Sequence, residues 1–524
     1  MKSAIYDDYM NLNYYAYLKA MQSKFTFLLP SDSALYYYYD PASMKSKTPR
    51  AIEFYFVGGS FPVKLRFRNY ISPYNYKGTD PVGTITGIVA GSNSAGSYTN
   101  SEVTNRLKDI LESHTIVHDG TNPMTREDQK YYGIDTSTPL DEYYLSKNGN
   151  AVKVVRDEND SVIAVKGGFQ LENERYFEKN GLDPAGAERG VLSCQLTKTR
   201  NVDNGHTYVL NSPLVPTYRS VWSIFTNDAD MKNVEGTGGE TPYSQFYDLC
   251  TADGYETEII GCGLVDGNLD KNKRTSALKK FKIFIDDKGL DYNVQFFNNY
   301  RYTIFVPSNE AVLAAIDAGL PTWEEIREDY RAHCKPYIDE ETGEPKVDVN
   351  GEIEYTDSLE TYEDSIRIAA KITYLTNFVR YHFADNSVFA DKTILPPSEM
   401  VTSSYDKELE LFCKLHVDRI ANGDGTDLRV CDDVTWKENG NKMEGSHMPF
   451  TTVGEKNILA RDISCNEKPF NASMKGKTIQ SSSAAVIHSI DGYLNHTKVI
   501  DGRHDKTWES TINAKRYLQR YAIR

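Results

Sequence analysis

The sequence predicts an α+β protein that contains the same kind of domain twice. A strand-like run that ends in proline and leads into a helix start occurs at residues 25–34 and again at residues 302–311. A helix that ends in histidine and then a closing strand follow each copy in the same order. The length of 524 residues also exceeds what one ordinary hydrophobic core requires, so more than one domain is expected.

The repeated opening run combines three local signals. Phe25 and Tyr302 each begin a stretch of apolar and β-branched residues, with Phe305 inside the second stretch, which favours a buried strand. Pro30 and Pro307 end the two stretches, because proline cannot donate a ladder hydrogen bond. A Ser-Asp or Ser-Asn pair follows each proline, and these side chains cap helix starts. The pattern therefore predicts a strand, a turn and a capped helix in both copies.

A helical landmark comes next. Apolar residues recur at helical spacing over residues 102–114 and 366–383, and the two helices end at His114 and at Tyr381-His382. His382 could be read as a general base, but no Ser or Cys partner for it can be named. We expect instead that Tyr381 buries its ring and that His382 hydrogen-bonds backbone groups at the corner between helix and strand.

The third landmark is a closing strand. It begins at His206 in the first copy and at Val486 in the second, where it contains His488 and Asp491. The three landmarks are separated by 277, 268 and 280 positions (25 to 302, 114 to 382 and 206 to 486). Nearly equal separations indicate two similar units that differ by loop insertions.

The remaining elements follow from alternation and turn signals. Residues 52–57 and 61–67 predict a hairpin around two glycines, and residues 143–165 predict short strands. Residues 408–417 and 427–430 predict a second pair of strands. An acidic, turn-rich stretch near residues 335–360 predicts an insertion on the surface, with Asn350-Gly351 as a hairpin turn.

Composition excludes several functional classes. The formal net charge is −15, which disfavours nucleic acid and a polybasic membrane contact. No stretch is long and apolar enough for a membrane span. The seven cysteines form no C-x-x-C pair, which disfavours a zinc site, and their pairing is left open. The 37 tyrosines suit β-rich structure with half-buried rings, and also wet interfaces.

Motifs of catalysis and cofactor binding are missing from the sequence. It contains no glycine-rich nucleotide loop, no nucleophile elbow and no His-Glu-x-x-His. Residues 266–277 resemble a calcium loop, but Lys271 replaces the required glycine and Ala277 the final glutamate. We therefore expect no enzyme activity, no cofactor and no metal.

These motifs resemble the fasciclin domain family. That family opens with F-T-x-F-x-P-(S/T)-(D/N)-x-A, from which the first copy departs at Leu28 and the second at Tyr302. Its Tyr-His junction is matched by Tyr381-His382, while the first copy keeps only His114. Its closing strand, V-I-H-x-I-D-x-x-L, is matched by residues 486–494, whereas the first copy departs at most positions. The resemblance implies two tandem α+β domains, each a β-sandwich or wedge with packed helices.

The resemblance also leads to a domain map. We expect domain 1 at residues 1–222, a linker at 223–242, domain 2 at 243–500 and a C-terminal tail at 501–524. The lead-in before the first opening strand is much shorter than the lead-in at residues 243–299. Domain 1 is therefore expected to be incomplete at its N-terminus, in a chain derived from a longer exported precursor.

The function that the resemblance implies is binding rather than catalysis. Members act mostly in adhesion or protein interaction at the cell surface, and similar tandem forms occur among surface lipoproteins of gut-type Gram-negative bacteria. We expect a cell-surface lipoprotein on the extracellular face of an outer membrane, which binds a protein or glycan. Its membrane contact would be a lipid anchor outside this chain. The alternative is an accessory scaffold subunit of an outer-membrane nutrient-import complex.

Overall fold

The computed structural model describes most of the chain from residue 100 onward and shorter pieces before it. The described residues are 24–31, 33–34, 37–39, 41, 50–55, 64–69, 96–97, 100–118, 120–187, 189–202, 204–217, 219–226, 241–251, 283–285, 293–294, 301–391, 398–422, 425–438, 440, 451–452, 455–465, 478–499 and 502–522. Residues 227–240 of the predicted linker and the calcium-like loop at 266–277 lie outside these ranges.

The N-terminal lobe is built on one sheet. Its strand order is β6 (Thr115–His118), β1 (Lys24–Pro30), β11 (Gly205–Leu210), β10 (Cys194–Val202), β9 (Val162–Lys166), β8 (Ala151–Arg156) and β7 (Tyr143–Leu145). The helices of this lobe are α3 (Asn100–Ser113), α4 (Arg126–Tyr132), α5 (Gly168–Asn180) and the short η2 (Pro184–Gly186). A smaller sheet contains β2 (Tyr37–Tyr39), β3 (Arg50–Tyr55), β4 (Lys64–Asn69) and β5 (Gly96–Ser97), and the antiparallel β3–β4 pair confirms the predicted hairpin.

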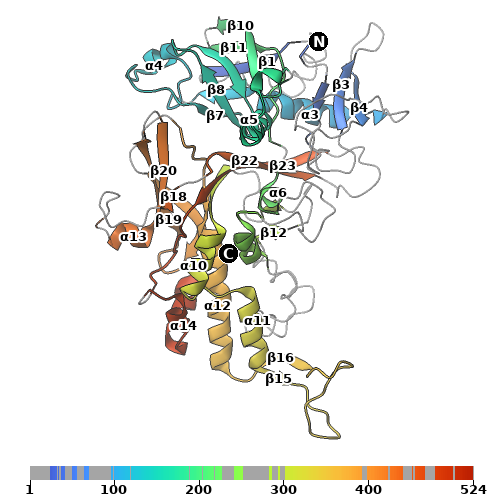
Figure 1. The fold of residues 1–524 in the computed structure, drawn as a ribbon, viewed down its shortest axis with the longest axis vertical. Helices are drawn as coiled ribbons and strands as arrows, with labels where there is room; N and C mark the ends of the chain where they lie inside the picture. The colour runs from blue at the N-terminus through green and yellow to red at the C-terminus, as the bar shows by residue number, and fades with distance from the viewer. Residues whose placement is uncertain are drawn as a thin grey trace.

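The C-terminal lobe carries the second large sheet, below the first in Figure 1. Its order is β21 (Thr451–Thr452), β20 (Gly425–Asp432), β19 (Leu411–Asn422), β18 (Ser398–Asp406), β17 (Phe383–Asp385), β14 (Arg301–Pro307), β23 (Ile479–Ile490) and β22 (Ile458–Cys465), with β24 (Tyr521–Ala522) on β18. A separate pair joins β12 (Phe284–Ile285) and β13 (Asn293–Val294). The predicted α+β class, with two sheets and packed helices, is confirmed.

The two lobes share one strand arrangement at their centres. In the first sheet, β1 pairs in parallel with β11 and antiparallel with β6. In the second, β14 pairs in parallel with β23 and antiparallel with β17. Thr26 lies opposite His206, and Thr303 lies opposite Val486, so the two opening strands meet the two closing strands in the same register. The landmarks that recur in the sequence are therefore neighbours in each sheet.

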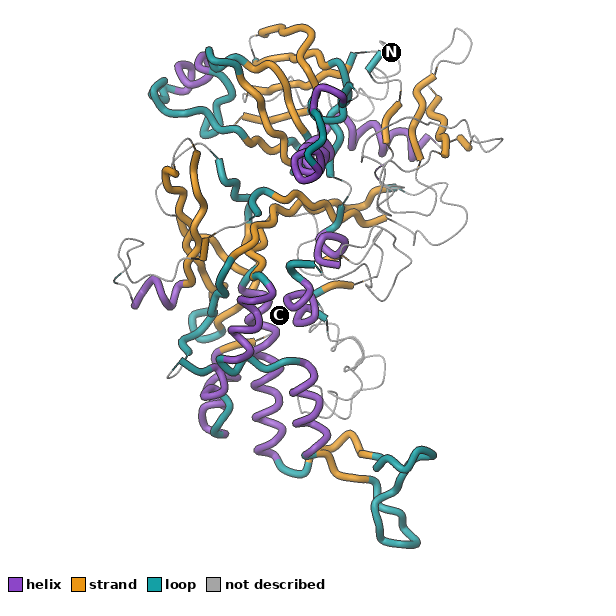
Figure 2. The backbone as a smooth tube through the Cα atoms, in the orientation of Figure 1, coloured by secondary structure: helices purple, strands orange, loops and turns teal. Residues whose placement is uncertain are grey.

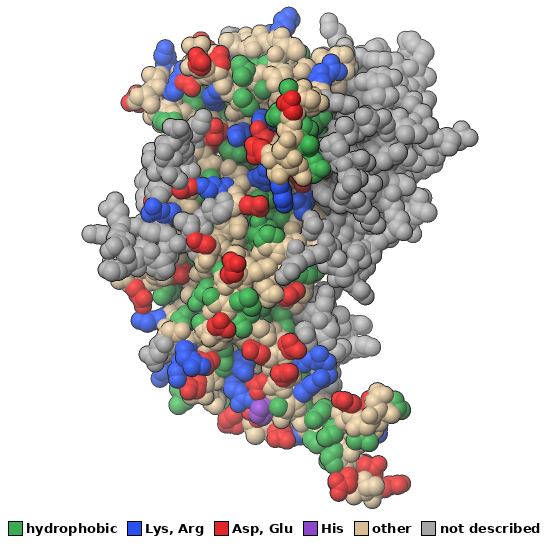
Figure 3. Space-filling view, in the orientation of Figure 1, with side chains coloured by type: hydrophobic (Ala, Val, Ile, Leu, Met, Phe, Trp, Pro, Cys, Tyr) green, Lys and Arg blue, Asp and Glu red, His purple; other side chains and the backbone are tan. Residues whose placement is uncertain are grey.

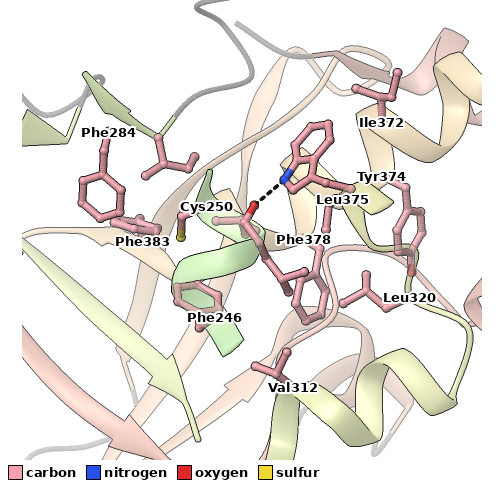
Figure 4. Packing of buried hydrophobic residues seen from close by; sticks show 14 of the residues in the cluster. Phe246, Cys250, Phe284, Val312, Leu320, Ile372, Tyr374, Leu375, Phe378 and Phe383 are labelled. Carbon is pink, nitrogen blue, oxygen red and sulfur yellow. Dashed lines mark hydrogen bonds between the residues drawn. The ribbon is translucent and has the colours of Figure 1, made fainter. Parts of the chain in front are cut away.

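Helix α12 (Tyr362–Tyr381) is the centre of the C-terminal lobe. Thr361 caps its start by accepting a hydrogen bond from the Asp364 N–H, and most of its length is buried. Around it lie α7 (Ser244–Cys250), α10 (Asn309–Asp317) and α11 (Trp323–Ala332). Figure 4 shows the apolar side chains between these helices, where the Trp323 ring N–H donates to the Leu249 carbonyl at 2.9 Å.

Two segments differ from the domain map. Helix α6 (Val221–Thr226), which the map divides between domain 1 and the linker, is fully buried in the C-terminal lobe, because Trp222 and Phe225 pack with Phe246. Residues 501–524, expected to be a tail, contain η4 (His504–Thr507) and α14 (Thr511–Arg520). Their apolar face, with Trp508 and Tyr517, completes the same core. The charged residues that suggested a tail lie on the other, exposed face of α14.

The predicted insertion forms an arm. Strands β15 (Cys334–Pro336) and β16 (Tyr355–Leu359) pair at its base, and the chain between them projects away from the lobe at the bottom of Figures 1 and 2. The predicted Asn350-Gly351 turn is present, with the Gly351 N–H donating to the Asp348 carbonyl at 3.1 Å. The remaining short helix, α13 (Asp433–Glu438), follows β20. Within the described ranges, no helix has the length and apolar character that crossing a bilayer requires.

Candidate binding cleft between the two lobes

A buried ion pair joins the two lobes. Arg461 of β22 is 1% exposed, and its guanidinium donates to both carboxylate oxygens of Asp109 on α3, at 2.5 and 3.3 Å. The Arg461 Nε also donates to Ser482 Oγ at 2.7 Å. Two charges removed from water are tolerated only when they are paired and further hydrogen-bonded, as they are in this contact. The pair therefore specifies one relative placement of the lobes.

Polar contacts to backbone reinforce this placement. Asn105 of α3 exchanges two hydrogen bonds with the backbone of Ile479, at 3.0 and 2.8 Å. Arg175 of α5 donates to the carbonyls of Lys456 and Asn457, both at 2.6 Å. A small apolar cluster crosses the same interface, and its buried members are Ala151, Leu171, Phe389, Leu459 and Val486.

Asp391 anchors one edge of the N-terminal lobe to the C-terminal lobe. Its carboxylate accepts hydrogen bonds from the N–H groups of Glu142, at 2.9 and 2.8 Å, and of Tyr143, at 3.1 Å. Beside it, the Tyr143 and Phe389 rings stack with centroids 4.8 Å apart and an interplanar angle of 2°. Burial raises the pKa of Asp391, while these backbone N–H groups lower it.

An open cleft of about 890 Å³ lies next to these contacts. One wall comes from the N-terminal lobe between residues 117 and 149, and the other from the C-terminal lobe. The second wall consists of Arg301, Ser387, Phe389, Asp391 and Arg419. A volume of this size is typical of sites for small molecules and short oligomers.

The charged residues that line the cleft are Arg301, Arg419, Lys147, Asp141 and Asp391, and the two arginines stand on one wall. Arg419 is half-buried, and burial lowers its pKa, while the nearby Asp391 and Asp141 raise it. Arg301 is exposed, and its aliphatic stem lies against Gly149, where a Cβ would come within 3.0 Å of the Arg301 Cγ. Gly149 has a φ of +85°, so both its turn conformation and this close approach favour glycine.

The sequence-predicted histidines form a matching corner in each lobe. His382 Nδ1 donates to the Phe378 carbonyl at 2.9 Å, and its Nε2 accepts from the Leu494 N–H at 3.1 Å. His114 makes the same two contacts, with the Ile110 carbonyl at 2.8 Å and the Leu214 N–H at 3.0 Å. An imidazole that donates at one nitrogen and accepts at the other must be neutral. Burial lowers the pKa of each to about 4, in agreement with that state.

The other predicted residues lie in or beside the sheets. Phe25 and Pro30 lie in β1, and Tyr302, Phe305 and Pro307 lie in β14, all of them buried. Tyr302 donates its hydroxyl hydrogen bond to Asp462 at 3.2 Å.

The predicted residues near the closing strand have different surroundings. The Tyr381 ring is buried, and its hydroxyl donates to the Lys414 carbonyl. His488 stacks on Phe305 and bonds the Val388 carbonyl at 2.9 Å, whereas Asp491 is exposed just after β23. None of the ten predicted residues lines the cleft, so the predicted motif residues and the cleft are separate sets.

The residues of the cleft were not predicted from the sequence. Arg301 directly precedes the β14 motif, and residues 148–150 were recognised only as a turn. The walls come from segments more than 150 positions apart in the chain, such as Gly149 and Arg301. Only the packing of the lobes brings them together, so no local pattern could have identified them.

The cleft supports binding rather than an identifiable reaction. No histidine or cysteine is among the side chains that line it in the described part of the chain. Over the same described residues, no group of three or more His, Cys, Asp or Glu side chains is arranged to hold a metal ion. The six described cysteines are free thiols, and Cys262 lies outside the described ranges.

Comparison with known proteins finds structural similarity alone. No family model matches the chain, and no curated protein does. One similar solved structure is a FAS1 domain pair from the insect cell adhesion molecule fasciclin I, at 9% identity. The alignment covers 94% of this chain and 97% of that one, with a TM-score of 0.22. A score this low carries no argument, so the fold described above stands on its own strand order and register.

Proposed function

We propose that this protein is a non-enzymatic adhesion protein with two fasciclin-like domains, exposed at the outer surface of a cell. It binds a protein or glycan in the cleft between the lobes. The observation that carries this proposal is a cleft whose two walls come from different lobes and are held together by the buried Arg461–Asp109 pair. A lipid anchor on the outer membrane is the attachment that the sequence resemblance favours.

Filling the cleft tests the proposal. Thr138 is exposed and lines the cleft, so Thr138→Trp would narrow the cleft without disturbing a core. We expect this variant to lose binding on glycan and matrix-protein arrays while it keeps the wild-type melting temperature. Thr197→Trp, at an exposed position on β10, is the control and keeps binding. Wild-type binding by Thr138→Trp would contradict a site in the cleft.

The arm favours a second candidate function, a scaffold subunit of an outer-membrane nutrient importer. Tyr337, Ile338, Val347 and Val349 are 50, 53, 53 and 100% exposed, although they are apolar. Figure 3 shows hydrophobic and acidic side chains along the arm at the lower right. Exposed apolar side chains on a projecting element are typical of a docking surface.

Purification from native membranes separates the two functions. If the protein is a scaffold, it co-purifies with an importer, and replacement of residues 337–354 by Asn-Gly abolishes this association. The shortened arm should leave stability unchanged, because these residues add nothing to the buried core of the lobe. A free, monodisperse protein that still binds glycan or matrix would favour adhesion.

A further inference from the structure

The two arginines of the cleft form no direct ion pair with the described residues. Arg419 is half-buried, yet within the described part of the chain no carboxylate lies within 4 Å of its guanidinium. The Arg301 guanidinium likewise makes no hydrogen bond or ion pair to the described residues. Charged groups that leave water are normally paired, and the chain as a whole is acidic, with a net charge of −15. The half-buried Arg419 is therefore an exception that a ligand in the cleft would resolve, and the exposed Arg301 faces the same cleft.

The nearest acidic side chain on the same wall is already engaged. Both oxygens of Asp391 accept hydrogen bonds from backbone N–H groups of the opposite wall. Its role is to hold the walls together, and it leaves the Arg419 guanidinium without a direct partner. Ser387 lies on the same wall, but its hydroxyl oxygen is buried and therefore not exposed to a ligand. The two guanidinium groups on this wall are thus the donors available to a ligand that carries acceptors.

The contacts that surround the cleft argue against a peptide as its ligand. A peptide commonly binds by adding a strand to a free sheet edge or by placing apolar side chains in pockets. Strand β7 forms the sheet edge at this cleft, but the Tyr143 N–H is already bound by Asp391, which blocks strand addition there. The Tyr143 ring is stacked on Phe389, and Tyr144 is only 2% exposed, so neither ring offers an apolar pocket.

We propose that the cleft binds an acidic oligosaccharide, whose carboxylates accept hydrogen bonds from Arg301 and Arg419. This inference rests on the binding function proposed above and names its ligand class. Guanidinium groups match carboxylates with two parallel hydrogen bonds. The cleft volume of about 890 Å³ suits two or three sugar residues rather than a single ion.

Calorimetric titration of the full chain tests this ligand class with trigalacturonate and neutral galactotriose. We expect trigalacturonate to bind, and galactotriose to bind at least about tenfold more weakly, because it lacks the carboxylates. Arg419→Gln and Arg301→Gln should each weaken trigalacturonate binding by about tenfold. The matched control is Arg200→Gln, at an exposed position on β10, which makes the same charge change outside the cleft and should bind normally.

The outcomes distinguish this inference from the proposed function. Equal affinity for galactotriose, or wild-type affinity in both Arg301→Gln and Arg419→Gln, would overturn the acidic-saccharide assignment. The Thr138→Trp test on arrays would be unaffected by that result. Tighter binding of a triglutamate peptide than of trigalacturonate, lost in Arg419→Gln, would replace the saccharide by an acidic peptide. Arg419→Gln should keep a melting temperature close to wild type, because its guanidinium makes no direct ion pair with the described residues.

Discussion

Each histidine corner connects three parts of a lobe through the backbone and side chain of one residue. His382 ends α12, and its own carbonyl accepts the Phe305 N–H of the opening strand at 3.0 Å. Its ring bonds the Leu494 N–H just after the closing strand. His114 repeats both contacts through the N–H groups of Leu28 and Leu214. A motif that reads as a catalytic candidate in sequence is therefore a structural junction in both lobes.

Removal of this junction should destabilise the protein. We expect His382→Ala to leave the Leu494 N–H and the Phe378 carbonyl buried without partners, at a cost of about 2–4 kcal/mol. Thermal denaturation followed by circular dichroism measures the effect as a lower melting temperature. His333→Ala, at a position with a 35% exposed side chain, is the control and should have a smaller effect. Wild-type melting of His382→Ala would contradict the junction role.

The same corners predict acid sensitivity. The folded-state pKa of His114 and His382 is about 4, below the unfolded value near 6.5, because burial disfavours the charged ring. The unfolded chain therefore binds more protons between these values, and stability is lost as the pH falls from about 6.5 towards 4. Each histidine should contribute a loss of about 2 kcal/mol at pH 5 relative to pH 7.

Urea unfolding at pH 7 and pH 5 measures this loss. The non-titrating variant His382→Gln should lose less stability than the wild-type protein over the same interval, even though it begins less stable. If both proteins lost the same stability, the lowered pKa of His382 would not be the cause.

At the scale of elements, local patterns predicted the opening and closing strands, the hairpins and helices α3, α10 and α12. The capped helix predicted after Pro30 is wrong, because a turn and strand β2 follow there. The β14 motif was predicted from Tyr302, Phe305 and Pro307 because strand, proline turn and helix cap are adjacent in sequence. Helix α14 was missed because Lys515, Arg516 and Arg520 dominate its composition. Its signal was the spacing of Ala514, Tyr517 and Leu518, three apolar positions on one helical face.

Helix α14 should contribute substantially to the stability of the C-terminal lobe. Tyr517 is 6% exposed, its ring lies 5.4 Å from that of Tyr374, and its hydroxyl bonds His496 at 2.9 Å. We expect Tyr517→Ala to lower the free energy of unfolding by about 3–5 kcal/mol through the cavity and the lost bond. Urea unfolding measures this, with Ile512→Ala at an exposed position of the same helix as the control. Equal stability of the two variants would restore the interpretation of this segment as a tail.

At the scale of the molecule, the cleft exists because the lobes are held in one arrangement. The single variant Arg461→Met leaves Asp109 buried without its main partner, which should cost about 3–5 kcal/mol. The double variant Arg461→Met/Asp109→Leu should recover most of that loss, because neither charge remains buried. Urea unfolding of the three proteins tests the pair. If the double variant were as unstable as the single one, the unpaired buried charge of Asp109 would not be the cause of the lost stability.

The interface also marks the limit of prediction from sequence. Local sequence motifs were sufficient to align the two copies at their opening strands, histidine corners and closing strands. Asp391 and Arg419 carry no such signal, because their roles depend on contacts with residues far away in the chain, as when Asp391 binds the backbone of Glu142. The fold was therefore predictable in outline, and the cleft was not.

Hydrogen exchange with and without trigalacturonate tests the central claim most directly, namely that both lobes contribute to one binding site. Mass spectrometry of the full chain reports which backbone amides become protected. A shared site predicts slower exchange in residues 120–149 and also around residues 387–391 and 419, with no change on ligand addition in Thr138→Trp. Protection confined to one lobe, or to the arm at residues 337–354, would contradict a shared cleft.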